Sequence, residues 1–120
     1  MGIEKFHIVT GHGHEHVKKF IENQSGTFNL IHNPEFQTKG NIYSLYCARE
    51  IFQEGFILIN SDTIFHPDIL KRVIKDPHEN VLAIDDYKIL GDEEMKVYSD
   101  ESKITKIHKK LDPQKADGEY

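Results

Sequence analysis

The chain has 120 residues, of which 38% are hydrophobic and 29% are charged, and its formal net charge is −5. This balance predicts at most one globular domain and excludes a disordered chain, while the negative charge argues against a broad nucleic-acid-binding face. There is one cysteine, no apolar run near the roughly 20 residues that span a bilayer, and no secretion signal in the first six residues, so we expect a cytoplasmic protein without an intramolecular disulfide or membrane contact.

The first half of the chain alternates between predicted strands and predicted helices. Short apolar strands are predicted at residues 6–10 and 28–31, and the helical spacing of apolar residues between them indicates a helix that ends before Gly26. Asn41 is expected to cap a second helix, which continues to about Phe52.

The second half contains the most apolar segments. Residues 56–60 and 81–84 are continuous apolar runs, typical of strands that are buried on both faces, and Pro67 fits the first turn of a helix between them. Residues 95–98 and 104–107 alternate in character, which predicts an antiparallel hairpin.

The predicted order is therefore β-α-β-α-β-α-β followed by β-β. Alternating units of this kind build a mostly parallel sheet with helices on both faces. We expect an α/β fold with a three-layer, Rossmann-like sheet, a C-terminal antiparallel hairpin and a loose tail from Asp112 to Tyr120. A phosphate-binding turn commonly follows the first strand of such folds, but Thr10-Gly11-His12-Gly13 contains neither Lys nor Arg.

Asp62 is the strongest single candidate for chemistry. It follows Ser61 directly after the most apolar predicted strand, which is where an α/β sheet presents its ligand-binding groups. A carboxylate there suits Mg²⁺ on a polyphosphate, because magnesium prefers hard oxygen ligands. An Asp that caps the following turn or helix has the same position, so position alone leaves both roles open.

The loop that begins at Asn33-Pro34 is a second candidate. It passes Thr38 and Gly40 and enters the helix predicted from Asn41, whose N-terminal N–H groups can bind a base edge or a phosphate. An ordinary capped surface loop has the same pattern and is favoured on this evidence alone.

Three alternating histidines precede the first predicted helix. His12, His14 and His16 contain no H-E-x-x-H arrangement, and residues two apart do not share a helix face, so surface histidines are favoured over a zinc site. Cys47 lies within a predicted helix and is interpreted as a core residue.

Two pairs of charged residues could either bind a ligand or serve only the fold. Lys109 and Lys110 alternate across the last predicted strand, where one of them could meet a phosphate, or both could protect a sheet edge. Asp85 and Asp86 follow a predicted strand as either a second acidic ligand pair or a turn.

Short segments along essentially all 120 residues match the order and spacing of motifs in a known protein family. These segments are residues 2–3, 6–11, 33–34, 38, 41–45, 59–62, 90–91, 94–97, 107–109 and 116–120. In this order and spacing they resemble the nucleotidyltransferase family that makes sugar nucleotides and CDP-alcohols. Asn-Pro followed by Asn-Ile-Tyr-Ser-Leu is most similar in style to cytidylyltransferases acting on phosphocholine, inositol phosphate or aminoalkylphosphonate.

The resemblance implies roles for five residues. Asp62 matches the carboxylate that binds catalytic Mg²⁺ beneath the α-phosphate, and Lys109 matches a basic residue near the acceptor's phosphate. Asn41, Ile42 and Ser61 fall in segments that line the nucleotide pocket. The implied reaction is attack by an acceptor phosphate on the α-phosphorus of a nucleoside triphosphate, with CTP favoured over UTP or dTTP, and pyrophosphate leaves.

The chain also departs from the family pattern. Such enzymes open with an apolar strand and a Gly-rich loop carrying a basic residue, then Pro-Lys, and a later segment brings a second metal-binding Asp. Gly11-His12-Gly13 aligns instead with the family's second strand. We therefore expect residues 1–120 to be a partial catalytic domain, a fragment with little or no activity alone.

Two alternatives remain open. The chain could be a non-catalytic remnant that binds a partner or associates with itself through an exposed sheet edge. It could also be a glycosyltransferase that uses a nucleotide sugar, although such enzymes usually carry Asp-x-Asp, and Asp62 is followed by Thr63-Ile64.

Overall fold

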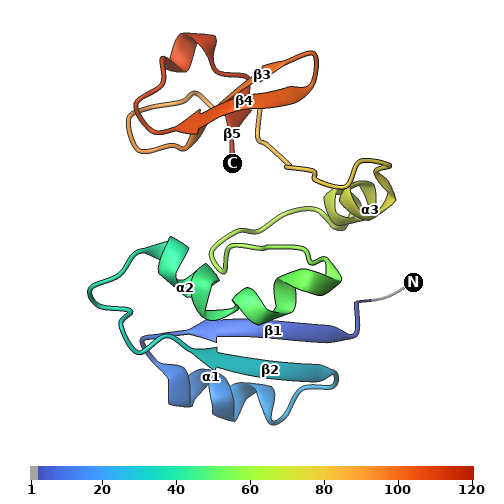
Figure 1. Cartoon of the computed structure of the whole chain (residues 1–120), viewed down its shortest axis with the longest axis vertical. Coiled ribbons are helices and arrows are strands. Elements are labelled where there is room, and N and C mark those ends of the chain that lie inside the picture. The colour runs from blue at the N-terminus through green and yellow to red at the C-terminus, as the bar shows by residue number, and fades with distance from the viewer. Residues whose placement is uncertain (1–2) are drawn as a thin grey trace. The chain divides into compact units, whose positions relative to one another are not determined.

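The computed structural model describes residues 3–120, apart from the side chain at position 54. The chain divides into two compact units, Met1–Asn60 and Ser61–Tyr120. Each unit contains its own small sheet (Figure 1).

The first unit is built on two parallel strands joined by a helix, as the sequence predicts. Its elements are β1 (Lys5–Thr10), α1 (His14–Ile21), β2 (Thr27–His32), α2 (Asn41–Cys47) and the 3₁₀ helix η1 (Arg49–Glu54). The strand register runs from Lys5 opposite Thr27 to Thr10 opposite His32. Helix α1 packs against β2 and α2 packs against β1 (Figure 1), so the sheet is flanked by helical segments.

The second predicted helix is shorter than expected. Helix α2 ends at Cys47, and the chain tightens into η1 after Ala48, whose backbone has φ −93° and ψ 6°. Such tightening is common at helix ends, because shorter-range hydrogen bonds satisfy the last carbonyls. The cap is also one residue earlier than predicted: Gly40 is the N-cap, and Asn41 is the first helical residue.

The second unit combines one helix with an antiparallel sheet. Its elements are α3 (Pro67–Lys75), β3 (Lys96–Asp100), β4 (Lys103–His108), the 3₁₀ helix η2 (Pro113–Lys115) and β5 (Gly118–Glu119). The strand order is β4-β3-β5. Helix α3 begins with Pro67 as predicted, and His66 caps it by accepting a hydrogen bond from the backbone N–H of Asp68 at 3.3 Å.

The predicted hairpin is confirmed as β3 and β4. Its two-residue turn is Glu101-Ser102, with φ values of 46° and 66°. Positive φ at both turn positions is what a type I′ hairpin requires, because that turn matches the twist of the strands. The register shifts between Tyr98 and Ser99, which pair with Lys106 and Ile104, so Thr105 is the extra residue of a bulge in β4.

The expectation of a loose tail is wrong for its last residues. Gly118 and Glu119 form β5, pairing with Val97 and Lys96 of β3, and Glu119 also bridges Asp85 through two backbone hydrogen bonds of 2.8 and 3.0 Å. A Cβ atom on Gly118 would lie 2.6 Å from the carbonyl oxygen of Asp85. Glycine is therefore needed here for the close approach of two backbones.

Two predicted strands, at residues 56–60 and 81–84, are not formed. Both segments run outside any named strand, and their large side chains are exposed, apart from the half-buried Leu82, rather than buried on two faces. A continuous apolar run indicates a tendency to be buried, but a strand also needs a neighbouring edge to pair with. The described residues thus form a two-stranded parallel sheet and a three-stranded antiparallel sheet, in a mixed α/β chain, and not one Rossmann-like sheet.

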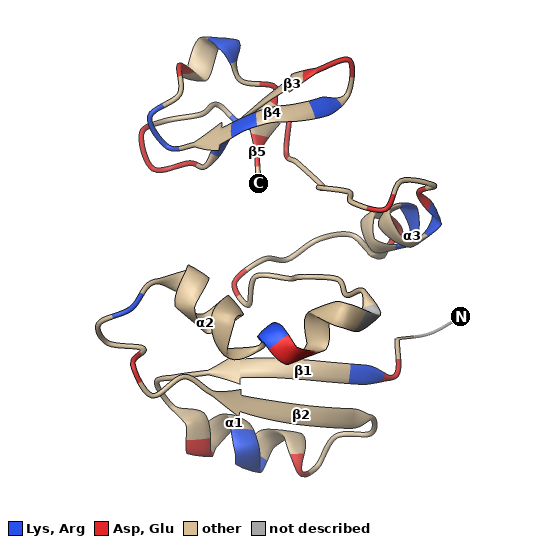
Figure 2. Ribbon diagram, viewed as in Figure 1, with Lys and Arg blue, Asp and Glu red and all other residues tan. Residues whose placement is uncertain are grey.

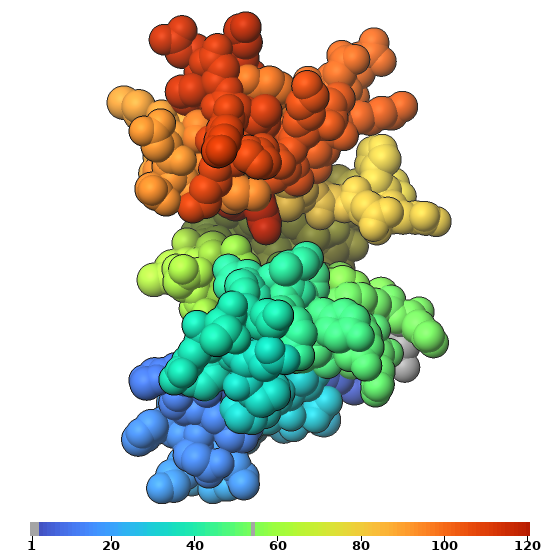
Figure 3. Space-filling view, turned by 60° about the vertical axis from the view of Figure 1, so that its left-hand side comes forward, coloured from blue at the N-terminus to red at the C-terminus, as the bar shows by residue number. Residues whose placement is uncertain are grey.

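Few side chains are withdrawn from solvent in the part of the chain that the structure describes. The buried residues are Thr10, Asn33, Ala48, Lys96, Val97 and Gly118. Even α2 and η1 of the first unit, in green, reach the surface in the space-filling view (Figure 3). None of the described helices is long and apolar enough to cross a membrane.

Candidate functional site

Asp62 lies in a turn with Ser61, immediately after the apolar segment Phe56–Asn60. Both turn residues are exposed. Within residues 3–120 the Asp62 carboxylate makes no hydrogen bond or ion pair, and His66 caps the helix that follows. Asp62 therefore does not cap the following turn or helix, and both of its carboxylate oxygens are available to a ligand.

Asp62 was predicted to bind Mg²⁺, and the surrounding residues determine whether other protein ligands are available. Among the described residues, no group of three or more His, Cys, Asp and Glu side chains is arranged to hold a metal ion. Asp62 alone does not form a complete metal-binding site. One carboxylate is nevertheless compatible with Mg²⁺ that arrives on a polyphosphate, because magnesium commonly keeps water and phosphate oxygens as its other ligands.

Asn41 and Ile42 start helix α2 in the first unit, at the end of a braced loop. Both residues are exposed, Ile42 to 78%. The brace is Asn33, which is 1% exposed. Its side-chain amide donates to Ser44 Oγ at 3.0 Å, and its Oδ1 accepts from the backbone N–H of Glu35 at 2.9 Å.

A second contact holds the same loop. The Tyr43 hydroxyl donates to Glu35 Oε1 at 2.8 Å, and this hydrogen bond raises the pKa of Tyr43. The backbone N–H of Asn33 also donates to the carbonyl of Thr10 at the end of β1, at 2.8 Å. The loop before Asn41 is thus tied both to helix α2 and to the sheet, and this arrangement presents Asn41 and Ile42 outward.

Lys109 lies in the turn after β4 in the second unit. Its half-exposed side chain places Nζ 3.0 Å from Glu93 Oε2. Its backbone carbonyl accepts a hydrogen bond of 2.6 Å from Nζ of Lys96, which also donates to the carbonyl of Glu94 at 3.2 Å. The burial of Lys96 is not evident from the sequence, because a lysine in an alternating strand is ordinarily a surface residue.

An ion-pair network lies beside this sheet. Lys88 Nζ is 3.1 Å from Glu94 Oε1 and 2.9 Å from Glu119 Oε1. The hydrogen bond from Lys88, with that from the backbone of Gly91, lowers the pKa of Glu94 to about 2. The same contacts to Glu119 and Glu94 raise the pKa of Lys88. The network joins the loop before β3 to strand β5.

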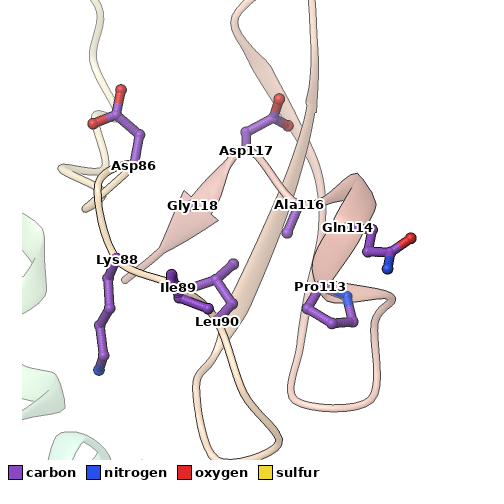
Figure 4. Close-up of a pocket in the computed structure, with 9 residues that line it drawn as sticks. All are labelled: Asp86, Lys88, Ile89, Leu90, Pro113, Gln114, Ala116, Asp117 and Gly118. Atoms are coloured by element: carbon purple, nitrogen blue, oxygen red, sulfur yellow. The ribbon is translucent and has the colours of Figure 1, made fainter.

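A hollow of about 380 Å³ lies next to that network in the second unit. Figure 4 shows the residues that line it, which are Asp86, Lys88, Ile89, Leu90, Pro113, Gln114, Ala116, Asp117 and Gly118. The carboxylate of Asp117 is already engaged, because its Oδ2 accepts from the backbone N–H of Ser99 at 2.6 Å and from Ser99 Oγ at 3.0 Å. The hollow therefore combines an apolar wall with Asp86 as its other acidic group.

The predicted site residues are divided between the two units. Asn41 and Ile42 belong to the first unit, whereas Ser61, Asp62 and Lys109 belong to the second. The structure describes each set within its own unit. Asn33 and Lys96 are the buried residues that hold two of these segments in place; Asn33 was predicted only to begin the candidate loop, and Lys96 had no predicted role.

Two curated proteins are similar to parts of this chain. The CMP-5′-(3-aminopropyl)phosphonate synthase of Streptomyces rubellomurinus is 26% identical over 85 residues, which cover 69% of this chain and 14% of that protein. The bifunctional IPC transferase and DIPP synthase of Thermococcus kodakarensis is 33% identical over 75 residues, which cover 62% of this chain and 17% of that protein.

These partial similarities support a nucleotidyltransferase family for the chain, as its segments predict. The chain thus spans less than a fifth of the length of each of these relatives. No protein-family model matches the chain. No solved structure matches it either.

Proposed function

We propose that this chain carries part of the active site of a nucleotidyltransferase that transfers a cytidylyl group from CTP to a phosphorylated small molecule and releases pyrophosphate. The observation that supports this most is the similarity to the Streptomyces CMP-5′-(3-aminopropyl)phosphonate synthase, a protein named for a CMP-phosphonate product. The exposed Asp62 carboxylate at the end of an apolar segment is consistent with it.

The reaction needs positioning and charge neutralisation more than covalent catalysis. A phosphate or phosphonate oxygen of the acceptor forms a bond to the α-phosphorus of CTP, and the bond from that phosphorus to the bridging oxygen of pyrophosphate breaks. Bound Mg²⁺ would neutralise charge on the phosphate oxygens, with Asp62 as its protein ligand. No group of three or more metal-ligating side chains is found among the described residues, so phosphate and water oxygens would complete the coordination.

Lys109 is proposed to hold the acceptor's anionic group. Its present partner is Glu93, an exposed carboxylate whose pairing in solvent is weak, with a typical contribution of about 0–1 kcal/mol. A phosphate or phosphonate can replace that carboxylate at little cost, since the lysine is already oriented toward an anion. Lys96 fixes the backbone from which the Lys109 side chain extends.

Asn41 and Ile42 of the first unit are proposed to contact the nucleotide, and Ser61 of the second unit is proposed to contact it as well. Asn41 has an amide that can pair with a base edge or a ribose hydroxyl, and Ile42 offers an apolar contact at the start of α2. The brace formed by Asn33 holds this loop in one conformation, which lowers the entropy cost of binding.

Turnover by this chain alone is not expected. The 120 residues contain no Gly-rich loop with a basic residue to hold the β- and γ-phosphates, because Gly11-His12-Gly13 lacks a cation. We expect weak, Mg²⁺-dependent binding of CTP without measurable pyrophosphate release when phosphocholine or 3-aminopropylphosphonate is added. Pyrophosphate release by the chain alone would overturn this part of the proposal.

Titration calorimetry with CTP and Mg²⁺ tests the proposed role of Asp62. Asp62→Asn should abolish the Mg²⁺-dependent binding, because it removes the charge and keeps the shape. Asp92→Asn is the matched control, since Asp92 is an exposed acid in the same unit. CTP binding that is equal in both variants would contradict the assignment, and UTP should bind more weakly than CTP.

A non-catalytic module is the second candidate function. It is favoured by the unpaired apolar segment Phe56–Asn60, which a purely enzymatic account leaves unexplained. If CTP binding is absent in the wild-type chain and association with a partner is present, this candidate is the better one.

A further inference from the structure

Two histidine side chains meet in the first unit, where its two parallel strands end. His14 is the first residue of α1, and His32 is the last residue of β2. Their ring centroids lie 4.7 Å apart, with an angle of 39° between the ring planes. His14 is half-buried and His32 is exposed. The contact therefore joins the start of a helix to the end of the strand that follows it, and solvent reaches both rings.

The ring of His14 is oriented by a buried residue. Thr10, the last residue of β1, is 7% exposed and lies opposite His32 in the sheet register. Its hydroxyl donates to the carbonyl of Ile31 at 3.4 Å, and its Oγ1 lies 2.6 Å from Nδ1 of His14. Because a hydroxyl has only one proton, Oγ1 accepts from Nδ1–H, and the lone pair of the neutral ring is on Nε2. A hydrogen bond from one ring nitrogen fixes the orientation of histidines that bind metals through the other.

The separation of the two rings fits a pair of ligands on one metal ion. With metal–nitrogen bonds of about 2.0–2.1 Å, two imidazole centroids in neighbouring positions lie roughly 4.5 Å apart at a right angle and roughly 5.2 Å apart at a tetrahedral angle. The observed separation of 4.7 Å lies between these values. Binding therefore requires at most a rotation of the exposed His32 side chain and no movement of the backbone.

The charge around the pair also suits a cation. Residues 6–17 and 27–34 contain no Lys or Arg, and Glu15 is their one acidic residue (Figure 2). Glu15 Oε1 lies 4.0 Å from Nε2 of His14. At this distance the carboxylate is not a ligand, but it offsets the positive charge of an ion on that nitrogen. Lys18 follows one turn later on α1, and its side chain is exposed.

We propose that His14 and His32 form a binding site for a divalent transition-metal ion of the class of Zn²⁺, Ni²⁺ and Cu²⁺. Imidazole is a preferred ligand of these ions, whereas Mg²⁺ prefers oxygen, so this site is distinct from the one proposed at Asp62. The described residues contain no group of three or more His, Cys, Asp and Glu side chains that could hold a metal ion, so water completes the coordination. The bound ion joins the start of α1 to the end of β2.

The other two histidines near α1 do not belong to this site. The ring of His12 lies 6.2 Å from that of Phe36. His16 is exposed on α1, two residues after His14, and residues two apart do not share a helix face. The spacing of His12, His14 and His16 could not predict the pair, because the second ligand comes from β2. These two residues are matched controls for the site.

Titration calorimetry of the full chain with Zn²⁺, without nucleotide, tests the proposal. The wild type should bind one ion saturably, and Mg²⁺ should not compete. His14→Asn and His32→Asn should each raise the Zn²⁺ dissociation constant by about tenfold or more, and Thr10→Val should raise it by about tenfold, because it removes the oxygen that orients His14. His12→Asn and His16→Asn should leave it unchanged.

NMR of the wild-type chain keeps the test decisive if a variant fails to fold. Long-range ¹H–¹⁵N spectra of the histidine rings should show that Zn²⁺ shifts the ring nitrogens of His14 and His32 together and leaves those of His12 and His16 in place. No saturable binding, a shift of only one of the paired rings, or an equal loss of affinity in His12→Asn and His14→Asn overturns the proposal. None of these outcomes depends on CTP, so the result is separate from that for the nucleotide site.

Discussion

Nζ of Lys96 lies 2.6 Å from the backbone carbonyl oxygen of Lys109, and Lys96 is only 1% exposed. A buried ammonium group ordinarily pairs with a carboxylate, because desolvation of a charge is costly. In this unit its described partners are two backbone carbonyls, those of Lys109 and Glu94. The lysine thus joins the loop before β3 to the turn after β4, and it fixes the backbone of the proposed acceptor-binding lysine.

Replacement of Lys96 by methionine should destabilise the second unit. The change keeps the apolar stem but leaves two carbonyls without their donor, and a buried acceptor that loses its partner costs about 1–3 kcal/mol. Urea denaturation should show a lower midpoint for Lys96→Met. Lys106→Met on exposed β4 is the control and should change the midpoint little. Equal midpoints in the two variants would contradict the structural role of Lys96.

Replacement of Asn33 by alanine should loosen the loop that presents Asn41. The variant loses the donor to Ser44 Oγ and the acceptor for the Glu35 N–H, both at a buried position. A loss of about 1–3 kcal/mol in unfolding free energy is expected in urea denaturation. Asn23→Ala, which removes one exposed hydrogen bond to the carbonyl of Lys19, should cost clearly less. A larger effect at Asn23 would show that the brace is unimportant.

Acid should destabilise the second unit through Glu94. Lys88 and the backbone of Gly91 lower the pKa of this carboxyl from 4.5 to about 2 in the folded chain. A group with a lowered folded pKa contributes stability above its unfolded pKa and loses it on protonation. Unfolding free energy should therefore decrease as pH falls from about 4.5 toward 2. Glu94→Gln should flatten that decrease and exposed Glu79→Gln should not, as measured by urea denaturation at several pH values; a slope unchanged by Glu94→Gln would argue against the network.

The strands that could be predicted from the sequence are those whose pairing strand lies nearby in the chain. The hairpin of β3 and β4 alternates on both sides of its turn, and β1 and β2 flank one short helix, so each strand finds its neighbour locally. Residues 56–60 and 81–84 have equally strong strand patterns, but a pattern of burial does not specify which edge will pair with it. Their predicted ladders are absent from the described structure.

Some residues of the candidate site could be predicted from the sequence, and others could not. The position of Asp62 after an apolar segment is evident from the sequence, and so is the N-terminal position of Asn41 on a helix. The buried residues that support the site were not predictable, because Lys96 and Asn33 belong to residue types that are mostly exposed. Strand β5 was missed because Gly118-Glu119 has low strand propensity and forms only by pairing with β3 and Asp85.

The most direct test of the proposed nucleotide site is a ¹H–¹⁵N NMR titration of the ¹⁵N-labelled full chain with CTP in the presence of Mg²⁺. The proposal predicts saturable shifts of the backbone amides of Asn41, Ile42, Ser61 and Asp62, which are reduced when Mg²⁺ is omitted and smaller with UTP. Shifts confined to other residues, or a spectrum that CTP leaves unchanged at millimolar concentration, would contradict the claim that this chain carries part of a cytidylyl-transfer site.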